Sequence, residues 1–319
     1  MLVVGGLLIA ALIGFRYEVG ADWRSYEYMF WFAGESDPST ILLSTSEVGY
    51  QLLNWGVHQF ELEIWAVNLA CGLIFTWGLM RFARTQPDPW LAVLVAIPYL
   101  VIVVAMGYSR QAVAIGILLA GLGRLERGGS TLRFALYVVA AALFHRTAVV
   151  ALPLIIFASE RNRLLNLLGG IALCVLFYDF FLSSEVDRLV KDYIEAQYAS
   201  QGAAIRVMMG VIPATVFLLN RRGLGFPDRQ RKIWLNFSLA SFGLLILLFV
   251  LPSSTAVDRL ALYVLPLQVA VLPRAAMSVF SRGLGTALIV LYSAAVLFVW
   301  LNFSQHSQYW IPYEFYPFR

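Results

Sequence analysis

Long apolar stretches alternate with short polar breaks along the whole chain. The stretches are about 14 to 21 residues long, the length at which a helix crosses or nearly crosses the hydrocarbon of a bilayer. Runs such as 91–105 and 239–251 are apolar on every face and lack the polar-inward alternation of a membrane barrel. Because lipid offers no hydrogen bonds to the backbone, such stretches fold as helices. The pattern predicts an all-α, polytopic membrane protein.

The charged breaks predict a bundle of eleven transmembrane helices. We see no internal repeat and no linker, so residues 1–319 are expected to form a single transmembrane domain. No basic region and no cleavage site precede Arg16, and the first run therefore reads as a retained helix. The expected spans are 2–15, 62–80, 90–107, 111–123, 132–144, 147–158, 164–182, 206–220, 233–251, 259–273 and 283–303.

Composition agrees with this interpretation. Apolar residues make up 60% of the chain and charged residues 13%, and the mean hydropathy is +0.75. These values lie outside the range of a soluble globular domain. Cys71 and Cys174 lie inside apolar stretches, so we interpret them as small buried hydrophobic residues and not as a disulfide, a metal pair or a nucleophile.

Charge predicts the orientation in the membrane. Lys and Arg concentrate in every second loop, most densely in the basic loop 221–232, whereas most Asp and Glu lie in the other loops. The positive-inside rule then places the N-terminus in the cytoplasm and the C-terminus outside. The pI of about 9.1 therefore reflects orientation, and we expect no nucleic-acid partner.

Two outer segments are long, 16–59 and 183–205. The first contains the amphipathic stretch 50–60, and the second spaces apolar residues among charged ones, so both are expected to contain periplasmic helices at the interface. The aromatic tail 309–318 is interpreted first as an interfacial anchor and second as a sugar-stacking platform.

The polar residues that are unusual beside apolar spans all fall at expected outer ends of spans or in outer loops. Charges flanked closely by hydrocarbon-length segments are costly unless they line a wet cavity or meet a partner, so each is a candidate functional residue. The set comprises Arg16, Asp22, Glu47, Arg110, His145, Arg146, Arg206, Asp258 and Arg259.

The arginines in this set point to a phosphate-bearing lipid, because a guanidinium fork matches phosphate oxygens with two parallel hydrogen bonds. A structural ion pair or a side chain that reaches to the interface is the alternative for any one of them. His145 fits a structural role or a general base, and Asp22 and Glu47 fit solvated loop carboxylates or bases. Signature motifs of nucleotide-binding enzymes, zinc proteases, serine hydrolases and Asp-x-Asp metal-dependent transferases are missing from the sequence.

The order of short motifs resembles the EpsG branch of the Wzy polymerases, which build O-antigen, capsule and exopolysaccharide. The resemblance extends over nearly the whole chain. It departs at Val48, where the family usually has Pro, and at Arg146, where it usually has Lys or Ser. The matching motifs are Arg16-x3-Gly20-x-Asp22-Trp23-x2-Tyr26, Glu47-x-Gly49-Tyr50, Arg110-Gln111, His145-Arg146-Thr147-Ala148 and Arg259-x3-Tyr263.

The resemblance implies a glycosyltransferase of the bacterial inner membrane that polymerises undecaprenyl-diphosphate-linked oligosaccharide repeat units on the periplasmic face, without metal or cofactor. Membrane lipid, a chain-length regulator and a flippase of the same pathway are the implied partners. Asp22 and His145, then Glu47, are the candidate bases. The remaining implied residues are Arg16, Arg110, Arg146 and Arg259, with Arg206 ranked lower, for the diphosphate, and Trp23, Tyr26, Tyr50, Gln111, Asp258 and Tyr263 for the rest of the substrate.

Three other functions stay open from the sequence. An O-antigen ligase or another lipid-linked glycosyltransferase needs similar outer Arg and carboxylate residues. A flippase or transporter would place its charges near the membrane midplane within broken helices, whereas these charges lie at span ends. An assembly partner of an export complex would tolerate conservative changes in the polar cluster.

Overall fold

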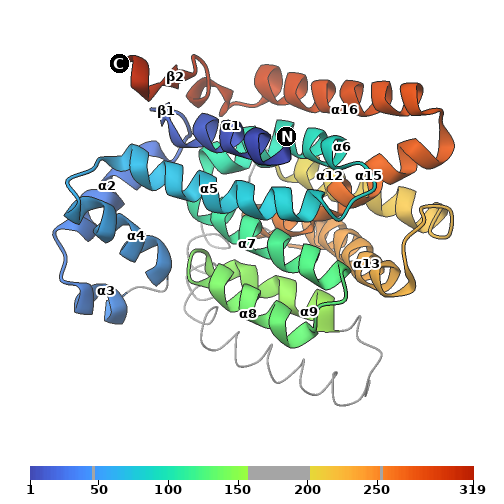
Figure 1. The fold of residues 1–319 in the computed structure, drawn as a ribbon, viewed down its shortest axis with the longest axis horizontal. Coiled ribbons are helices and arrows are strands. Elements are labelled where there is room, and N and C mark those ends of the chain that lie inside the picture. Colours follow the sequence, from blue (N-terminus) through green and yellow to red (C-terminus); the bar gives the residue numbers. More distant parts are fainter. Residues whose placement is uncertain (45–46, 157–201, 252–253) are drawn as a thin grey trace.

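The computed structural model describes residues 1–319 except 45–46, 157–201 and 252–253. Within the described part the protein is a bundle of helices with one two-stranded sheet (Figure 1). The first half contains α1 (Leu2–Gly14), β1 (Arg16–Tyr17), α2 (Trp23–Gly34), α3 (Pro38–Ser44), α4 (Val48–Gln59), α5 (Ile64–Ala83), α6 (Pro89–Ala96), the π-helix η1 (Ile97–Ala105), α7 (Ser109–Glu126), α8 (Thr131–Ala142), the 3-10 helix η2 (Arg146–Val150) and α9 (Ala151–Ile156).

The second half contains α12 (Ala203–Leu219), α13 (Asp228–Val250), α14 (Ser254–Ala261), η5 (Leu262–Val264), α15 (Pro266–Val279), α16 (Arg282–Phe303), η6 (Ser307–Tyr309), β2 (Glu314–Phe315) and η7 (Tyr316–Phe318). The expected span 164–182 and the expected outer segment 183–205 up to residue 201 lie outside the described residues. The expected amphipathic stretch 50–60 is helical as α4.

Within the described ranges, three helices are long and apolar enough to cross a membrane by length and composition: α5, α13 and α16. The segments Ser254–Val264 and Pro266–Val279 meet that test together, with a bend of 51° between them. Other apolar helices are shorter: Leu2–Gly14, Pro89–Ala105, Thr131–Ala142, Arg146–Ile155 and Ala203–Leu219. The fold is therefore that of a helical membrane protein.

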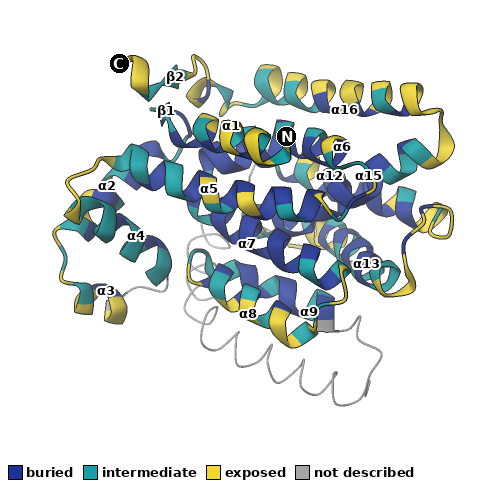
Figure 2. Ribbon diagram, viewed as in Figure 1, coloured by how far each residue is buried: buried dark blue, intermediate teal, exposed yellow. Residues whose placement is uncertain are grey.

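Helix α7 forms the centre of the bundle, and every residue from Gln111 to Gly123 on it is buried (Figure 2). Its contact with α5 is close because glycines face each other: a Cβ on Gly78 would lie 1.8 Å from the carbonyl oxygen of Gly116. Small residues let helix backbones approach this closely in membranes. On the periphery, α16 exposes large apolar side chains such as Leu291 and Phe298, as expected for a lipid-facing helix.

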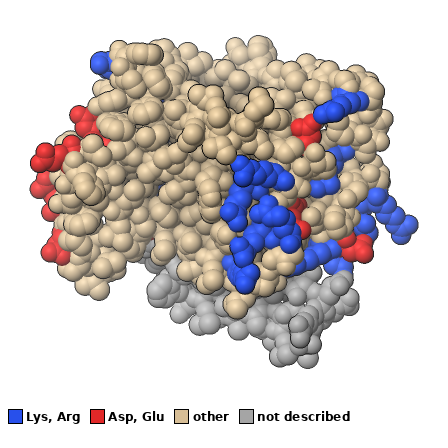
Figure 3. All heavy atoms as spheres, viewed as in Figure 1, with Lys and Arg blue, Asp and Glu red and all other residues tan. Residues whose placement is uncertain are grey.

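Charges separate toward opposite ends of the bundle (Figure 3). Acidic side chains gather where α2, α3 and α4 lie, which we call the acidic end. Basic side chains gather where α7 and α15 end and α8, α13 and α16 begin, which we call the basic end. The acidic end carries Glu18, Glu27, Glu35, Asp37 and Glu61, and the basic end carries Arg81, Arg84, Arg124, Arg127, Arg133, Arg221, Arg222, Arg229, Arg231, Lys232, Arg274 and Arg282.

The C-terminal tail returns to the first polar segment. Strand β2 pairs antiparallel with β1, and the backbone N–H of Gly20 donates to the carbonyl of Tyr309 at 2.8 Å. Trp310 is buried and donates from its indole Nε1 to the carbonyl of Ile102 in η1 at 2.7 Å. The sequence predicts an interfacial anchor or a sugar platform for this tail, and nothing in its contacts tests either role. The contacts show that the tail fastens the segment after α1.

Candidate functional site

Glu47 is the hub of a polar cluster at the acidic end. It lies just before α4, and its carboxylate forms an ion pair with Arg110 in the first turn of α7. Its second oxygen lies 2.7 Å from Nδ1 of His145, in the turn between α8 and η2. The backbone fixes this meeting, because the N–H of Gly49 donates to the carbonyl of Leu143 at 2.9 Å. Three motifs that are distant in the sequence therefore join at one buried carboxylate.

The electrostatics keep Glu47 ionised. Burial by itself would raise the pKa of this carboxyl, but the hydrogen bond with His145 and the positive charge of Arg110 outweigh burial and lower the pKa to about 2. A carboxylate held in this way is a weak base. It can instead orient the imidazole: when Nδ1 donates to Glu47, Nε2 is left as the acceptor, and Nε2 is buried without a partner among the described residues.

Two tyrosines line the same cluster. The guanidinium of Arg110 lies 5.7 Å from the ring centroid of Tyr26, and the rings of Tyr26 and Tyr50 meet edge to face at 5.6 Å. Both tyrosines are buried, and the hydroxyl of Tyr50 has no partner among the described residues. A cation held against an aromatic face and bonded to a carboxylate has a fixed position, which favours recognition of an anionic group.

Asp22 lies beside this cluster but, unlike Glu47, is not bonded to it. It precedes α2 but does not cap it, and no described residue donates a hydrogen bond to its carboxylate. Partial burial raises the pKa of Asp22, although the nearby charges of Arg110 and Arg259 act in the opposite direction. A half-buried carboxylate that is not committed to a protein partner is suited to taking a proton from a ligand.

Arg16 points into the protein. Its Nε donates to the carbonyl of Val19, its Nη1 to that of Ile13 at 2.7 Å, and its Nη2 to Asn68 and Ser109 at 2.9 and 2.7 Å. The side chain is 1% exposed. These bonds tie the end of α1 to α5 and α7, so the guanidinium fork is occupied by protein groups. Trp23 lies against it, with its ring centroid 5.9 Å from the guanidinium carbon.

The candidates late in the chain reach the cluster through Gln111 on α7 and Thr147 on η2. Gln111 donates to the carbonyl of Arg259 at 3.0 Å, and Thr147 donates to the hydroxyl of Tyr263 at 3.1 Å. The side chain of Arg259 is exposed, whereas Gln111 and Tyr263 are buried. Arg146 is half-buried at the start of η2, next to His145 in the chain.

Arg206 and Asp258 form a second group. They pair at 2.5 Å between α12 and α14, and Tyr108 lies close enough to Arg206 to interact with its charge. Tyr108 directly precedes the first turn of α7 that carries Arg110, so the two groups adjoin. Among the described residues, no three His, Cys, Asp or Glu side chains are placed to share a metal ion.

Several structural partners of the site were missed by sequence reasoning. Asn68 and Ser109 hold Arg16, Tyr108 joins the two groups, and Thr147 bonds to Tyr263. A signal existed for Asn68, which is a polar amide in the middle of an otherwise apolar stretch.

Comparison with known proteins gives one family. The EpsG family model matches residues 1–315, which is nearly the whole chain. Neither a curated protein nor a solved structure matches. The match extends across all the motifs that meet at Glu47 and across the second group as well. This chain therefore belongs to the EpsG family.

Proposed function

We propose that this protein is a glycosyltransferase that joins undecaprenyl-diphosphate-linked repeat units into a polysaccharide. Membership of the EpsG family supports a membrane polymerase role. The observation that carries the proposal is the junction of Glu47, Arg110 and His145 beside the uncommitted carboxylate of Asp22. Together they bring a base and a fixed cation to one place.

The proposed site faces the periplasm. The acidic end holds the cluster, and the basic end lies opposite, which is the charge distribution that the positive-inside rule gives for a basic end in the cytoplasm. In a bacterial inner membrane this orientation exposes the cluster to lipid-linked repeat units that have already crossed the membrane.

The chemistry is a displacement at the anomeric carbon of the donor sugar. The acceptor hydroxyl oxygen forms the new glycosidic bond, its proton goes to Asp22, and the bond to the lipid diphosphate breaks with its electron pair on the departing oxygen. Proton removal by a positioned base contributes about 10²- to 10⁴-fold. The negative charge that develops on the diphosphate is stabilised by Arg110, Arg146 and Arg259.

The other residues act around this step in the proposal. Glu47 orients His145 and Arg110, and Arg16 positions the segment that carries Asp22. Arg206 is neutralised by Asp258 and contributes less. The tyrosines of the cluster, with Gln111 and Trp23, shape the space for the sugars.

A reconstituted reaction tests the proposal. Purified protein in nanodiscs is incubated with a lipid-linked repeat unit, without nucleotide and with a metal chelator, and the lipid-linked products are separated by size. A ladder of longer glycans is expected from the wild type and none from Asp22→Asn. Absence of a ladder from correctly folded wild-type protein with its own repeat unit contradicts the proposal.

One observation favours transport as a second candidate. The bend of 51° between η5 and α15 breaks a helix pair that would otherwise form one span, and broken helices are common in transporters. Movement of the intact repeat unit across proteoliposomes, without any ladder, would establish this function instead.

A further inference from the structure

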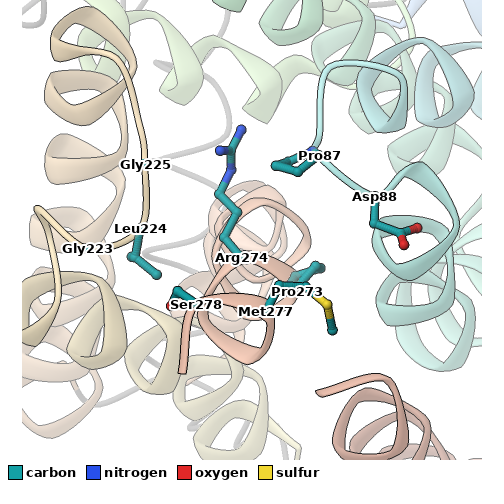
Figure 4. Close-up of a pocket in the computed structure, with 9 residues that line it drawn as sticks. All are labelled: Pro87, Asp88, Gly223, Leu224, Gly225, Pro273, Arg274, Met277 and Ser278. Atoms are coloured by element: carbon teal, nitrogen blue, oxygen red, sulfur yellow. The ribbon is translucent and has the colours of Figure 1, made fainter. Parts of the chain in front are cut away.

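A pocket of about 220 Å³ opens at the basic end, and Glu47 is not among its lining residues (Figure 4). Three segments form it: the loop before α6, the loop between α12 and α13, and the last turns of α15. Its lining residues are Pro87, Asp88, Gly223, Leu224, Gly225, Pro273, Arg274, Met277 and Ser278.

Arg274 is the cation of this pocket. Its guanidinium carbon lies 4.2 Å from the ring centroid of Phe226, and its Nε is 3.4 Å from the side-chain oxygen of Gln86. Neither terminal nitrogen forms a hydrogen bond or ion pair with a described residue. In Figure 4 the side chain extends from α15 toward the space between the other two segments. The stacked ring fixes the guanidinium plane while its outer edge stays available.

The two nearest carboxylates are already engaged. Asp88 accepts hydrogen bonds from the backbone N–H groups of Trp90 and Leu91 at 3.1 Å each, and Arg282 lies 3.9 Å away at the rim. Glu126 is bonded by Thr85, Gln86 and Trp234, and no ion pair joins it to Arg274. Neither carboxylate therefore forms an ion pair with Arg274.

The surroundings match a ligand with an anionic group and an apolar part. Leu224 and Met277 give the pocket an apolar wall, and Val279, Phe280 and Leu284 are exposed immediately after it in the chain. Arg221 and Arg222 are exposed in the adjoining loop. Basic pockets between helix ends on the cytoplasmic side are suited to lipid headgroups.

We propose that this pocket binds a phosphate group, held bidentately by Arg274. The phosphate belongs either to an anionic phospholipid of the cytoplasmic leaflet or to a soluble phosphate compound. This site goes beyond the polymerase reaction and does not depend on it, because none of its residues belongs to the cluster at the acidic end.

Native mass spectrometry of the full chain, released from nanodiscs of equal phosphatidylglycerol and phosphatidylcholine, measures the lipid arm. Arg274→Gln removes the cation, and Ser278→Trp fills the pocket without changing charge. Arg133→Gln, an exposed arginine at the same end that does not line the pocket, is the matched control. Loss of one charge-assisted pair is expected to lower phosphatidylglycerol retention about tenfold in Arg274→Gln.

Inorganic phosphate measures the soluble arm. It is titrated against wild-type protein in phosphatidylcholine nanodiscs while the Tm is recorded, with chloride at equal ionic strength as the reference. Selective phosphatidylglycerol retention that both pocket variants lose, and Arg133→Gln keeps, establishes a lipid phosphate. A Tm rise with phosphate that both variants lose establishes a soluble ligand. Equal behaviour of wild type and both pocket variants in both arms overturns the proposal.

Discussion

Replacing Glu47 with alanine should destabilise the protein strongly. The change removes the ion pair with Arg110 and the hydrogen bond with His145, and it leaves a buried cation without its counter-charge. The side chains of Glu47 and Arg110 are 10% and 28% exposed, so solvent replaces little of the loss. Breaking a buried ion pair from one side costs about 3 to 5 kcal/mol. We expect the free energy of unfolding to fall by about that amount.

The pH dependence gives an independent measure of the same interaction. The pKa of Glu47 is lowered from 4.5 to about 2 in the folded protein. Because the folded pKa is depressed, the stabilisation is complete above about pH 4.5 and is lost as the pH falls toward 2. A pKa difference of this size corresponds to about 3 kcal/mol, in agreement with the ion-pair figure.

Unfolding in mixed micelles of lipid and sodium dodecyl sulfate, followed by circular dichroism, measures both effects. Glu27→Ala is the control, because Glu27 also pairs with an arginine at the acidic end, but there the arginine side chain is 80% exposed. That variant should stay within about 1 kcal/mol of the wild type. If Glu47→Ala lost no more stability than Glu27→Ala, or kept the wild-type dependence between pH 5 and 2, our account of the cluster would be wrong.

The remaining predictions concern activity and the tail. Asp22→Asn should lower the polymerisation rate by about 10²-fold or more at unchanged protein level. Only the wild type should gain activity with rising pH, because Asp22 then loses its proton. A normal rate in the variant would exclude Asp22 as the base. Arg110→Lys should abolish polymerisation although the charge is kept, because an ammonium cannot form the planar fork, so wild-type product ladders would exclude bidentate binding. Trp310→Phe removes the indole donor to Ile102 and should cost about 1 kcal/mol in the same micelle assay. Gly107→Ala should cost more than Trp310→Phe, because a Cβ there would lie 2.4 Å from the Trp310 ring; equal values would show that the tail adjusts.

Local features of the fold could be predicted from the sequence. Helix α1 ends one residue before the expected boundary of its span, and the tight turn at His145 lies between α8 and η2 as the apolar runs on both sides indicated. These features depend on the length of each apolar run and on residues that are adjacent in the chain, and both can be read from the sequence. The number and orientation of the spans stay predictions.

The partners of each polar side chain could not be predicted. Glu47 meets Arg110 and His145 across 63 and 98 residues, and the order of motifs says only that they share one end of the bundle. Arg16 was expected to face a ligand but turns inward, because Asn68 and Ser109 lie where α5 and α7 pass the end of α1. Such pairings depend on how the helices rotate and pack, which periodicity does not determine.

The return of the tail to the first segment affects how the protein is made. Gly20 obtains its backbone partner from Tyr309, and β1 obtains its neighbour from β2. The two regions are separated by nearly the whole chain, so the ribosome makes the N-terminal one first and the C-terminal one last. The surroundings of Asp22 therefore stay unfinished throughout membrane insertion and reach their final form only when the last residues arrive, so a truncated chain carries every proposed catalytic group without the structure that holds them in place.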